Sequence, residues 1–202
     1  TISNRFKSSI NIWSDWNTPT SFFVKEIDWL DYDNTKNGIE QKISDHATRI
    51  LFASKHPTRN AVLYATSKKI GVLEYTNNTV VYNRLATSPS SYSTTYNTAV
   101  SALWIDDVTI LVAYNNSNTK TQYFTTMTYD FTNHAFSVLL EYTAYTFSTF
   151  PTVSPFRYDL YKLPISSYYF YICIYCDDTN ICVGYFVNYL GNTLSSICVA
   201  IL

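Results

Sequence analysis

Histidine is the side chain best suited to acid–base chemistry near neutral pH, and it occurs only three times among the 202 residues, as His46, His56 and His134. The run Ser44-Asp45-His46 contains the residue types of a hydrolase triad. Adjacent loop residues rarely converge as a triad, and the sequence has no Gly-x-Ser-x-Gly turn. We therefore predict no catalytic residue in this run.

Two pairs of neighbouring carboxylates, Asp106-Asp107 and Asp177-Asp178, are the next candidates for acid–base work. Glycoside hydrolysis would need two carboxyl groups held at a fixed separation in a cleft. Both pairs instead fall where a turn between strands is needed, and Asp is a common turn residue. We predict turns at both pairs and a chain that is not an enzyme.

A calcium-like run of oxygen ligands occurs at Asp33-x-Thr35-x-Asn37-Gly38. The acidic residue that a calcium loop needs at its twelfth position is replaced by Ser44. The Asn-Gly step is itself a strong hairpin signal. The sequence therefore predicts a hairpin here, and no metal or cofactor.

All four cysteines lie in the last 30 residues, at Cys173, Cys176, Cys182 and Cys198. Structural zinc usually requires two Cys-x-x-Cys knuckles, and only one is present, inside an apolar run. We predict disulfides and an oxidising compartment, with four reduced, buried thiols as the alternative.

The pairing of these cysteines stays open among three connectivities. A hairpin centred on Thr179 would set Cys176 opposite Cys182. A hairpin centred on Leu190 would set Cys182 opposite Cys198. Both partners are therefore geometrically possible for Cys182.

Two Asn-x-Ser/Thr sequons, at Asn77 and Asn115, are predicted glycosylation sites because both fall in predicted hairpin turns. Together with the cysteines they favour an extracellular or cell-surface protein. The chain starts at Thr1 rather than Met, so we expect a processed or partial product.

The four tryptophans could offer apolar ring faces to a sugar. We predict core packing for Trp29 and Trp104. Trp16 lies in a turn cluster beside Pro19, which makes it the candidate exposed aromatic contact.

The elements that must carry these residues are strands. The chain has 19 Tyr and 12 Phe, which favour a pleated sheet. Charged residues make up only 14% and the net charge is −1, so we expect no nucleic-acid partner. No run of about 18 apolar residues occurs, so we expect no membrane span.

The clearest strand pattern covers residues 100–140, which read as four short strands joined by polar turns. Weaker copies flank it. The sequence predicts one all-β domain, residues 1–202, made of antiparallel meander units at residues 9–43, 49–85, 100–143 and 151–201. The first unit has only three strands.

A short motif recurs in the last hairpin of each unit, with a polar residue, an aromatic residue and a turn. Its polar positions are Asp31, Glu74, Asp130 and Asn188. Four-stranded meanders at such spacing resemble divergent β-propeller repeats of secreted and cell-surface proteins. The resemblance implies a propeller-like fold, with a β-sandwich as the alternative, and it transfers no functional residue.

The missing strand of the first unit would expose unpaired backbone groups and invite another chain. Residues 1–8, residues 193–201 or a neighbouring subunit could fill the gap. We therefore predict a structural glycoprotein that self-associates into a homo-oligomer or filament. A carbohydrate- or protein-binding propeller is the alternative, and a glycan-acting enzyme comes third.

Overall fold

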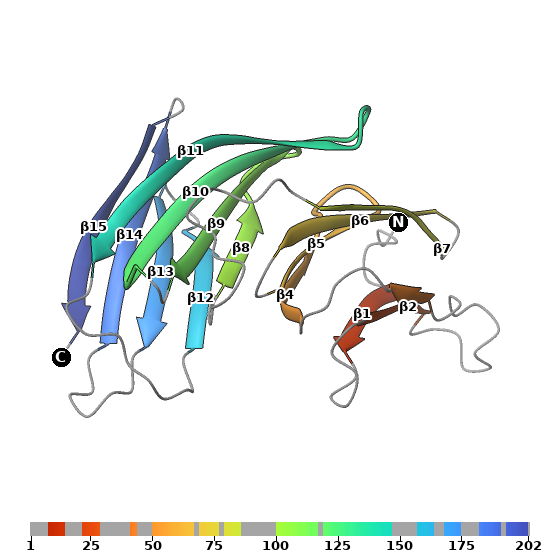
Figure 1. Cartoon of the computed structure of the whole chain (residues 1–202), viewed down its shortest axis with the longest axis horizontal. Helices are drawn as coiled ribbons and strands as arrows, with labels where there is room; N and C mark the ends of the chain where they lie inside the picture. Colours follow the sequence, from red (N-terminus) through yellow and green to blue (C-terminus); the bar gives the residue numbers. More distant parts are fainter. Residues whose placement is uncertain are drawn as a thin grey trace, which may run out of the picture.

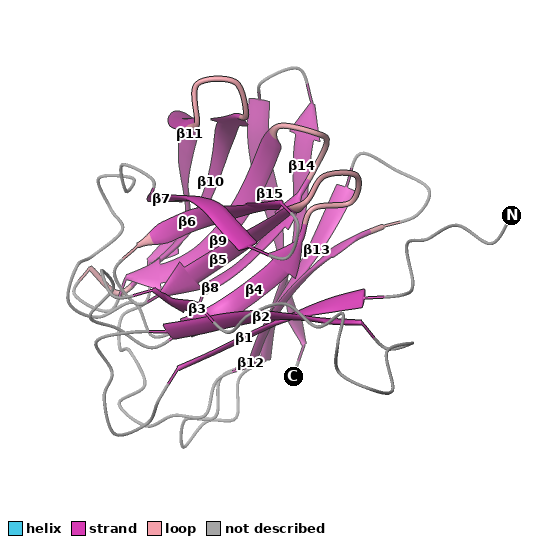
Figure 2. Cartoon of the chain, turned by 90° about the vertical axis from the view of Figure 1, so that its right-hand side faces the viewer, coloured by secondary structure: helices cyan, strands magenta, loops and turns pink. Residues whose placement is uncertain are grey.

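The computed structural model contains only strands and turns in the part of the chain that it describes, with no helix there (Figures 1 and 2). The described residues are 8–14, 22–28, 41–43, 50–66, 69–76, 79–85, 100–116, 119–146, 157–163, 168–174, 182–190 and 193–201. Within them, no helix has the length and hydropathy needed to span a membrane.

Fifteen described strands form four antiparallel sheets, and each sheet is a meander in chain order. The first sheet contains β1 (Ser8–Ser14), β2 (Phe22–Asp28) and β3 (Gln41–Ile43). The second contains β4 (Ile50–Lys55), β5 (Ala61–Thr66), β6 (Ile70–Thr76) and β7 (Thr79–Leu85). The third contains β8 (Val100–Trp104), β9 (Thr109–Asn116), β10 (Thr121–Asp130) and β11 (Ala135–Thr146). The fourth contains β12 (Arg157–Lys162), β13 (Tyr168–Ile174), β14 (Cys182–Leu190) and β15 (Thr193–Ile201).

This arrangement confirms the predicted all-β, propeller-like fold with meander units of three to four strands. The alternative of a two-sheet sandwich is wrong, because the strands divide into four sheets. Figure 1 shows the first and second sheets on the right of the view and the third and fourth on the left.

The third sheet lies between the second and the fourth, and the two faces of β9 pack against different neighbours. Successive residues of a strand point to opposite faces. Ile110 and Val112 pack in a cluster shared with the second sheet, whereas Leu111 and Ala113 pack in a cluster shared with the fourth. All of β9 is buried, so neither face of the sheet meets water there.

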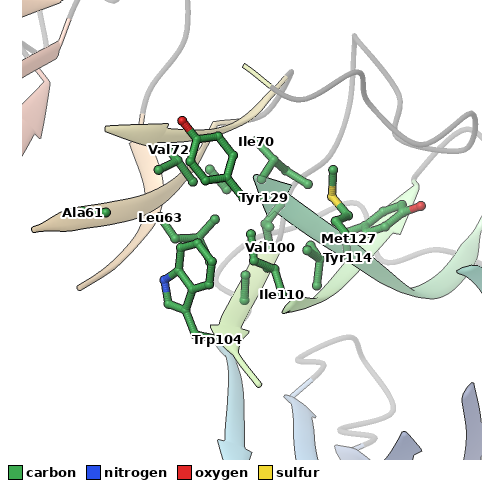
Figure 3. Close-up of a cluster of buried hydrophobic side chains, with 13 residues drawn as sticks. Ala61, Leu63, Ile70, Val72, Val100, Trp104, Ile110, Tyr114, Met127 and Tyr129 are labelled. Atoms are coloured by element: carbon green, nitrogen blue, oxygen red, sulfur yellow. The ribbon is translucent and has the colours of Figure 1, made fainter. Parts of the chain in front are cut away.

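The larger cluster joins the second and third sheets (Figure 3). Its buried members are Ala61, Leu63, Ala65, Ile70, Val72, Val100, Ala102, Trp104, Ile110, Val112, Tyr114, Met127 and Tyr129. The predicted core position of Trp104 is confirmed, since its side chain lies in this cluster and is only 8% exposed.

The smaller cluster joins the third and fourth sheets. Leu111 and Phe124 of the third sheet pack with Leu160, Val187 and Leu194 of the fourth. A hydrogen bond adds to this contact, because the backbone N–H of Leu160 donates to Ser101 Oγ at 3.2 Å. The same face-to-face packing therefore occurs twice along the chain.

The sheets form an open arc. Their first strands lie next to one another, β1 by β4, β4 by β8, and β8 by β12. Among the described strands, extensive contacts join only consecutive sheets, so the fourth sheet does not close onto the first. Each end of the arc thus has one sheet face without a neighbouring sheet from this part of the chain.

The first sheet contains three described strands in the order β1-β2-β3. The prediction that residues 193–201 could fill its gap is wrong, because these residues form β15 and pair with β14. Ser8 belongs to β1, and residues 1–7 lie outside the described part. An added strand from another chain stays a prediction.

Gly71 allows a large side chain to pack across the second sheet. It pairs with Tyr64 on the neighbouring strand, and a Cβ atom at position 71 would overlap the Tyr64 ring. Tyr64 is fully buried, and burial raises the pKa of its hydroxyl. Only glycine leaves room for the ring.

Strand register corrects both predicted alignments of Cys182. Cys182 pairs with Ile174 on one side and Ile201 on the other, while Cys198 pairs with Tyr185. The predicted alignment of Cys182 opposite Cys176 is therefore wrong. Its predicted alignment opposite Cys198 is wrong as well. It assumed a turn centred on Leu190, but Leu190 is still paired, and the hairpin connection is residues 191–192.

Candidate interaction site

Three connections meet at one end of the second and third sheets. They are residues 56–60 between β4 and β5, residues 105–108 between β8 and β9, and residues 131–134 between β10 and β11. The first and third connections of a meander lie at the same end because each strand reverses direction. We call these three connections the loop platform.

His56 joins two loops of the platform. The backbone N–H groups of Thr58 and Arg59 donate to His56 Nδ1 at 3.1 and 2.9 Å. Because Nδ1 accepts, the ring proton must be on Nε2, which donates to the Asp107 carbonyl oxygen at 3.0 Å. One neutral imidazole thus fixes its own loop and the next sheet's loop together.

The neutral form of His56 is also favoured by its surroundings. The side chain is 1% exposed, and burial lowers the imidazole pKa below its usual value. The hydrogen bond to the Asp107 carbonyl and the Asp107 charge raise this pKa, whereas the Arg59 charge lowers it further. Protonation would place a proton on Nδ1, where two N–H groups already point.

Aromatic rings surround this imidazole. Its centroid lies 4.4 Å from Trp104 and 5.3 Å from Phe131, both in edge-on arrangements. The Arg59 guanidinium lies over the Phe131 ring, 4.4 Å from the centroid. Such a cation–π contact holds the arginine side chain against the ring.

The exposed carboxylates of the platform stabilise turns. Asp106 Oδ1 accepts from the backbone N–H groups of Val108 and Thr109 at 2.9 and 2.7 Å. Partial burial raises the pKa of Asp106, but these hydrogen bonds and the nearby Lys162 charge lower it further, so the net shift is downward. The predicted turn at residues 106–107 is thus explained by Asp106 itself.

Asp130 stabilises the turn between β10 and β11 in the same way, by accepting hydrogen bonds from residues that follow it. It accepts from the Asn133 amide at 2.6 Å and from the Thr132 backbone N–H at 2.7 Å, and these hydrogen bonds lower its pKa. A general acid would need a raised carboxyl pKa. The shifts at Asp106 and Asp130 run the other way, as expected for carboxylates that hold turns.

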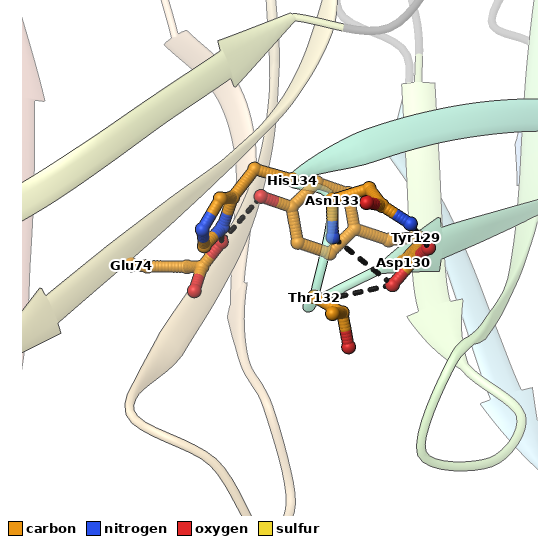
Figure 4. Close-up of polar contacts among 6 residues, drawn as sticks. All are labelled: Glu74, Tyr129, Asp130, Thr132, Asn133 and His134. Carbon is orange, nitrogen blue, oxygen red and sulfur yellow. Dashed lines mark hydrogen bonds and ion pairs between the residues drawn. The ribbon is translucent and has the colours of Figure 1, made fainter.

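A second group of hydrogen bonds joins the second and third sheets, through His134 of the platform and Tyr129 of β10 (Figure 4). Glu74 of β6 accepts at Oε1 from the buried Tyr129 hydroxyl at 2.5 Å. His134 Nδ1 lies 2.8 Å from the same oxygen. A carboxylate only accepts, so Nδ1 carries the proton and donates. His134 has a positive φ of 52°, which turns its ring back toward Glu74.

One hydroxyl of the platform lies beside an imidazole. Thr58 Oγ1 is 3.4 Å from His56 Nδ1, but this hydroxyl donates to Asp107 Oδ1 at 3.0 Å, so the three groups do not follow the order of a triad. In the described part of the chain, no group of three or more His, Cys, Asp or Glu residues could hold a metal ion. The exposed residues of the platform include Thr58, Arg59, Val108 and Asn133.

The predicted glycosylation sites have different outcomes. Asn115 does not lie in a turn, because it belongs to β9 and its side chain is fully buried. A glycan on Asn115 would be incompatible with this burial in the folded chain. Asn77 lies outside the described residues.

Trp16 and Cys176 also lie outside the described part of the chain. Cys173, Cys182 and Cys198 are placed in β13, β14 and β15 by their backbone. The disulfides and the aromatic contact at Trp16 stay predictions.

The residues of the platform were not predicted as a group. His56 and Asp107 are 51 positions apart, and no local pattern connects them. One signal was present: the recurring polar positions Glu74 and Asp130 fall in third strands of their sheets, at the side where the platform forms. Following the motif could have led to Glu74, but not to Arg59.

Comparison with known proteins gives structural likeness at low identity. The chain superposes on the structure of Kluyveromyces lactis Hsv2p with a TM-score of 0.50 and 9% identity, over 96% of this chain and 57% of that one. For the WD40 domain of SCAP from fission yeast the TM-score is 0.49 and the identity 10%, over 98% of this chain and 46% of that one.

No protein-family profile matches the sequence, and a sequence comparison with curated proteins gives no match either. The chain spans about half the length of the two solved chains. At 9% identity the likeness to Hsv2p concerns the fold alone. Together with the four stacked meanders, it supports a divergent β-propeller architecture.

Proposed function

We propose that this chain is a non-enzymatic propeller-type scaffold that binds a protein partner through the loop platform. The observation that carries the proposal is the Arg59 guanidinium stacked on Phe131, on loops that His56 holds together. Fixing the contact residues before binding lowers the entropy cost of association. Arginine and aromatic residues are also enriched at the energetic centres of protein interfaces.

The exposed groups indicate what the partner presents. Arg59 would donate to carbonyl or carboxylate oxygens, and Val108, which is 40% exposed, would contact an apolar side chain. Sugar stacking on Phe131 is less well supported, because Arg59 covers a face of this ring. A protein surface supplies both kinds of group within a short distance.

A structural glycoprotein that self-associates, as the sequence predicts, is the second candidate function. An extracellular or cell-surface location, the disulfides and a glycan at Asn77 stay proposals that rest on sequence features alone. The absence of enzyme activity is likewise part of the proposal. It is supported by the turn-stabilising roles of Asp106 and Asp130.

A peptide-display selection on the full chain tests the platform. We expect selected peptides to lose at least about tenfold in affinity, about 1.4 kcal/mol, when Arg59→Ala or Phe131→Ala replaces the native chain. The matched control is Lys120→Gly, which removes a cation between β9 and β10 at a positive φ of 53°. Binding of these peptides to the control should be unchanged.

Circular dichroism and thermal unfolding would verify that each variant is folded. Peptides that bind Arg59→Ala and Phe131→Ala as tightly as the native chain would contradict the platform as the binding surface. Loss of binding in Lys120→Gly alone would place the surface at the other end of the sheets.

A further inference from the structure

The sheets stack head to tail. The third sheet uses one face for the second sheet and the opposite face for the fourth, as the alternation of Ile110 and Leu111 shows. A stack of this kind leaves one unpaired face at each end. The open arc places these two faces on the first and the fourth sheets.

The outward face of the fourth sheet contains an exposed aromatic residue. Leu160 of β12 is 8% exposed and packs against the third sheet, whereas the next residue, Tyr161, is 51% exposed. On β15, Leu194 is buried in the same way, while Thr193 and Ser195 beside it are exposed. Tyr161 therefore lies on the face that turns away from the rest of the arc.

Strand register shows which residues share the row of Tyr161. Tyr161 pairs with Phe170, Phe170 with Phe186, and Phe186 with Ile197. Residues that pair in this way belong to one face of a sheet. This row crosses all four strands and contains only aromatic and aliphatic residue types. Such a composition is expected where one sheet packs against another.

The following row has the same character at three of its positions. Ile172 pairs with Gly184, and Gly184 pairs with Val199. Glycine inside a strand often marks a place where another backbone approaches closely. Asp159, which pairs with Ile172, is the polar member of the row and lies on the first strand of the sheet.

We propose that this face binds the first sheet of a second copy, so that two arcs close into one ring. The contact continues the packing already present between the second and third and between the third and fourth sheets. Both partners are sheets of this chain, and the first sheet also has one face turned away from its neighbour. The ring would then contain two identical contacts related by a twofold axis.

Contact area favours closure over an open chain of copies. The first sheet is the smaller partner, with described strands of seven, seven and three residues, which cover about 270 Å² on each side. One such contact buries about 540 Å² in total, far below the usual range for a stable complex of about 1,200–2,000 Å². Two contacts in a closed ring reach about 1,100 Å², near the lower end of that range.

Sedimentation velocity on the full chain tests the proposal. We expect a dimer at micromolar concentration that does not grow at higher concentration, and a monomer for Tyr161→Glu, because a buried carboxylate without a partner opposes the contact. The matched control is Val138→Glu, which places the same charge at a residue of β11 that is 41% exposed. The control should stay dimeric.

A photo-crosslinking amino acid at position 161 tests the direction of the contact. In a mixture of isotope-labelled and unlabelled chains, we expect intermolecular products that join position 161 to residues 8–43. Products within residues 157–201 of the other copy would overturn the head-to-tail arrangement. A native chain that stays monomeric near millimolar concentration, a Tyr161→Glu dimer, or continued growth into longer chains would each overturn the ring.

Discussion

At position 71 the fold requires a residue without a side chain. Its neighbour Tyr64 fills the space that any Cβ atom would need. The backbone pairing of these two residues brings the ring against the strand, and its complete burial leaves it little space to move. Packing of this kind is specified by a pair of residues rather than by either one.

We expect Gly71→Ala to lower the free energy of unfolding by about 1–3 kcal/mol, because the added methyl group overpacks a closed site. Urea unfolding measures the change. In a Tyr64→Leu background the same substitution should cost at least about 1 kcal/mol less, since the ring is gone. Equal costs in both backgrounds would show that Tyr64 does not cause the constraint.

His56 and Thr58 connect the loops of the second and third sheets, because each of them donates a hydrogen bond to Asp107. The His56 ring accepts two hydrogen bonds within its own loop and donates one to Asp107 of the next sheet. The charged groups that face it are Asp107 and Arg59. Because only the neutral ring can do all of this, the connection between these elements depends on pH.

The pKa of His56 is lowered in the folded chain, so the unfolded chain binds the additional proton first. Its stabilisation is complete above the unfolded pKa of about 6.5 and is lost as the pH falls through the lower folded pKa. We expect urea unfolding to show this loss in the native chain. His56→Gln should remove the His56 part of the pH dependence, whereas His134→Gln should retain it.

An unchanged pH dependence in His56→Gln would assign the effect to other groups. Asp106 provides an internal comparison, because its pKa is also lowered and its contribution is lost only as the pH falls below the ordinary range for aspartate. The two contributions therefore fall in separate pH ranges and can be separated in one titration.

Most strands could be predicted from the sequence, because Asn- and Asp-rich turns separate runs of aromatic and β-branched residues. The unit predicted at residues 49–85 ends at Leu85, where β7 also ends. Register was harder, since the end of β14 depends on one or two residues. The sequence predicts Leu190 as the turn centre, but Leu190 pairs with Thr193. As a result Cys182 pairs with Ile201, three positions beyond Cys198.

At the scale of the whole molecule, the third sheet stabilises both of its neighbours. Leu111 and Ile110 are adjacent in β9 but contribute to different clusters. The edge strand β11 is different, because residues such as Leu139 are 43% exposed. Stability should therefore decrease from the inner part of this sheet to its outer edge.

Hydrogen exchange checks this gradient. We expect the amides of β9 to exchange slowest among those of the third sheet, at rates set by global unfolding, because both faces of the strand are buried. The outward amides of β11 should exchange faster by orders of magnitude. Equal protection of β9 and β11 would mean that another chain or element covers the outer edge.

The number of units could be predicted from the recurring motif, but the loop platform and the order of packing could not. The motif is local, with Glu74 and Tyr75 adjacent in the chain. The contacts that make the platform join residues such as Arg59 and Phe131, which approach only when two sheets stack. Asn115 shows the same limit, since burial by neighbouring sheets overrides its turn-like sequence.

The alternation along β9 also constrains how such a chain can change its length over generations. Losing an internal unit would bring together two faces that were never shaped for each other. Losing or duplicating a terminal unit changes one interface only. Lineages of this kind would therefore lengthen and shorten at their ends, while the middle units diverge mainly in their loops, where Arg59 and Asn133 lie.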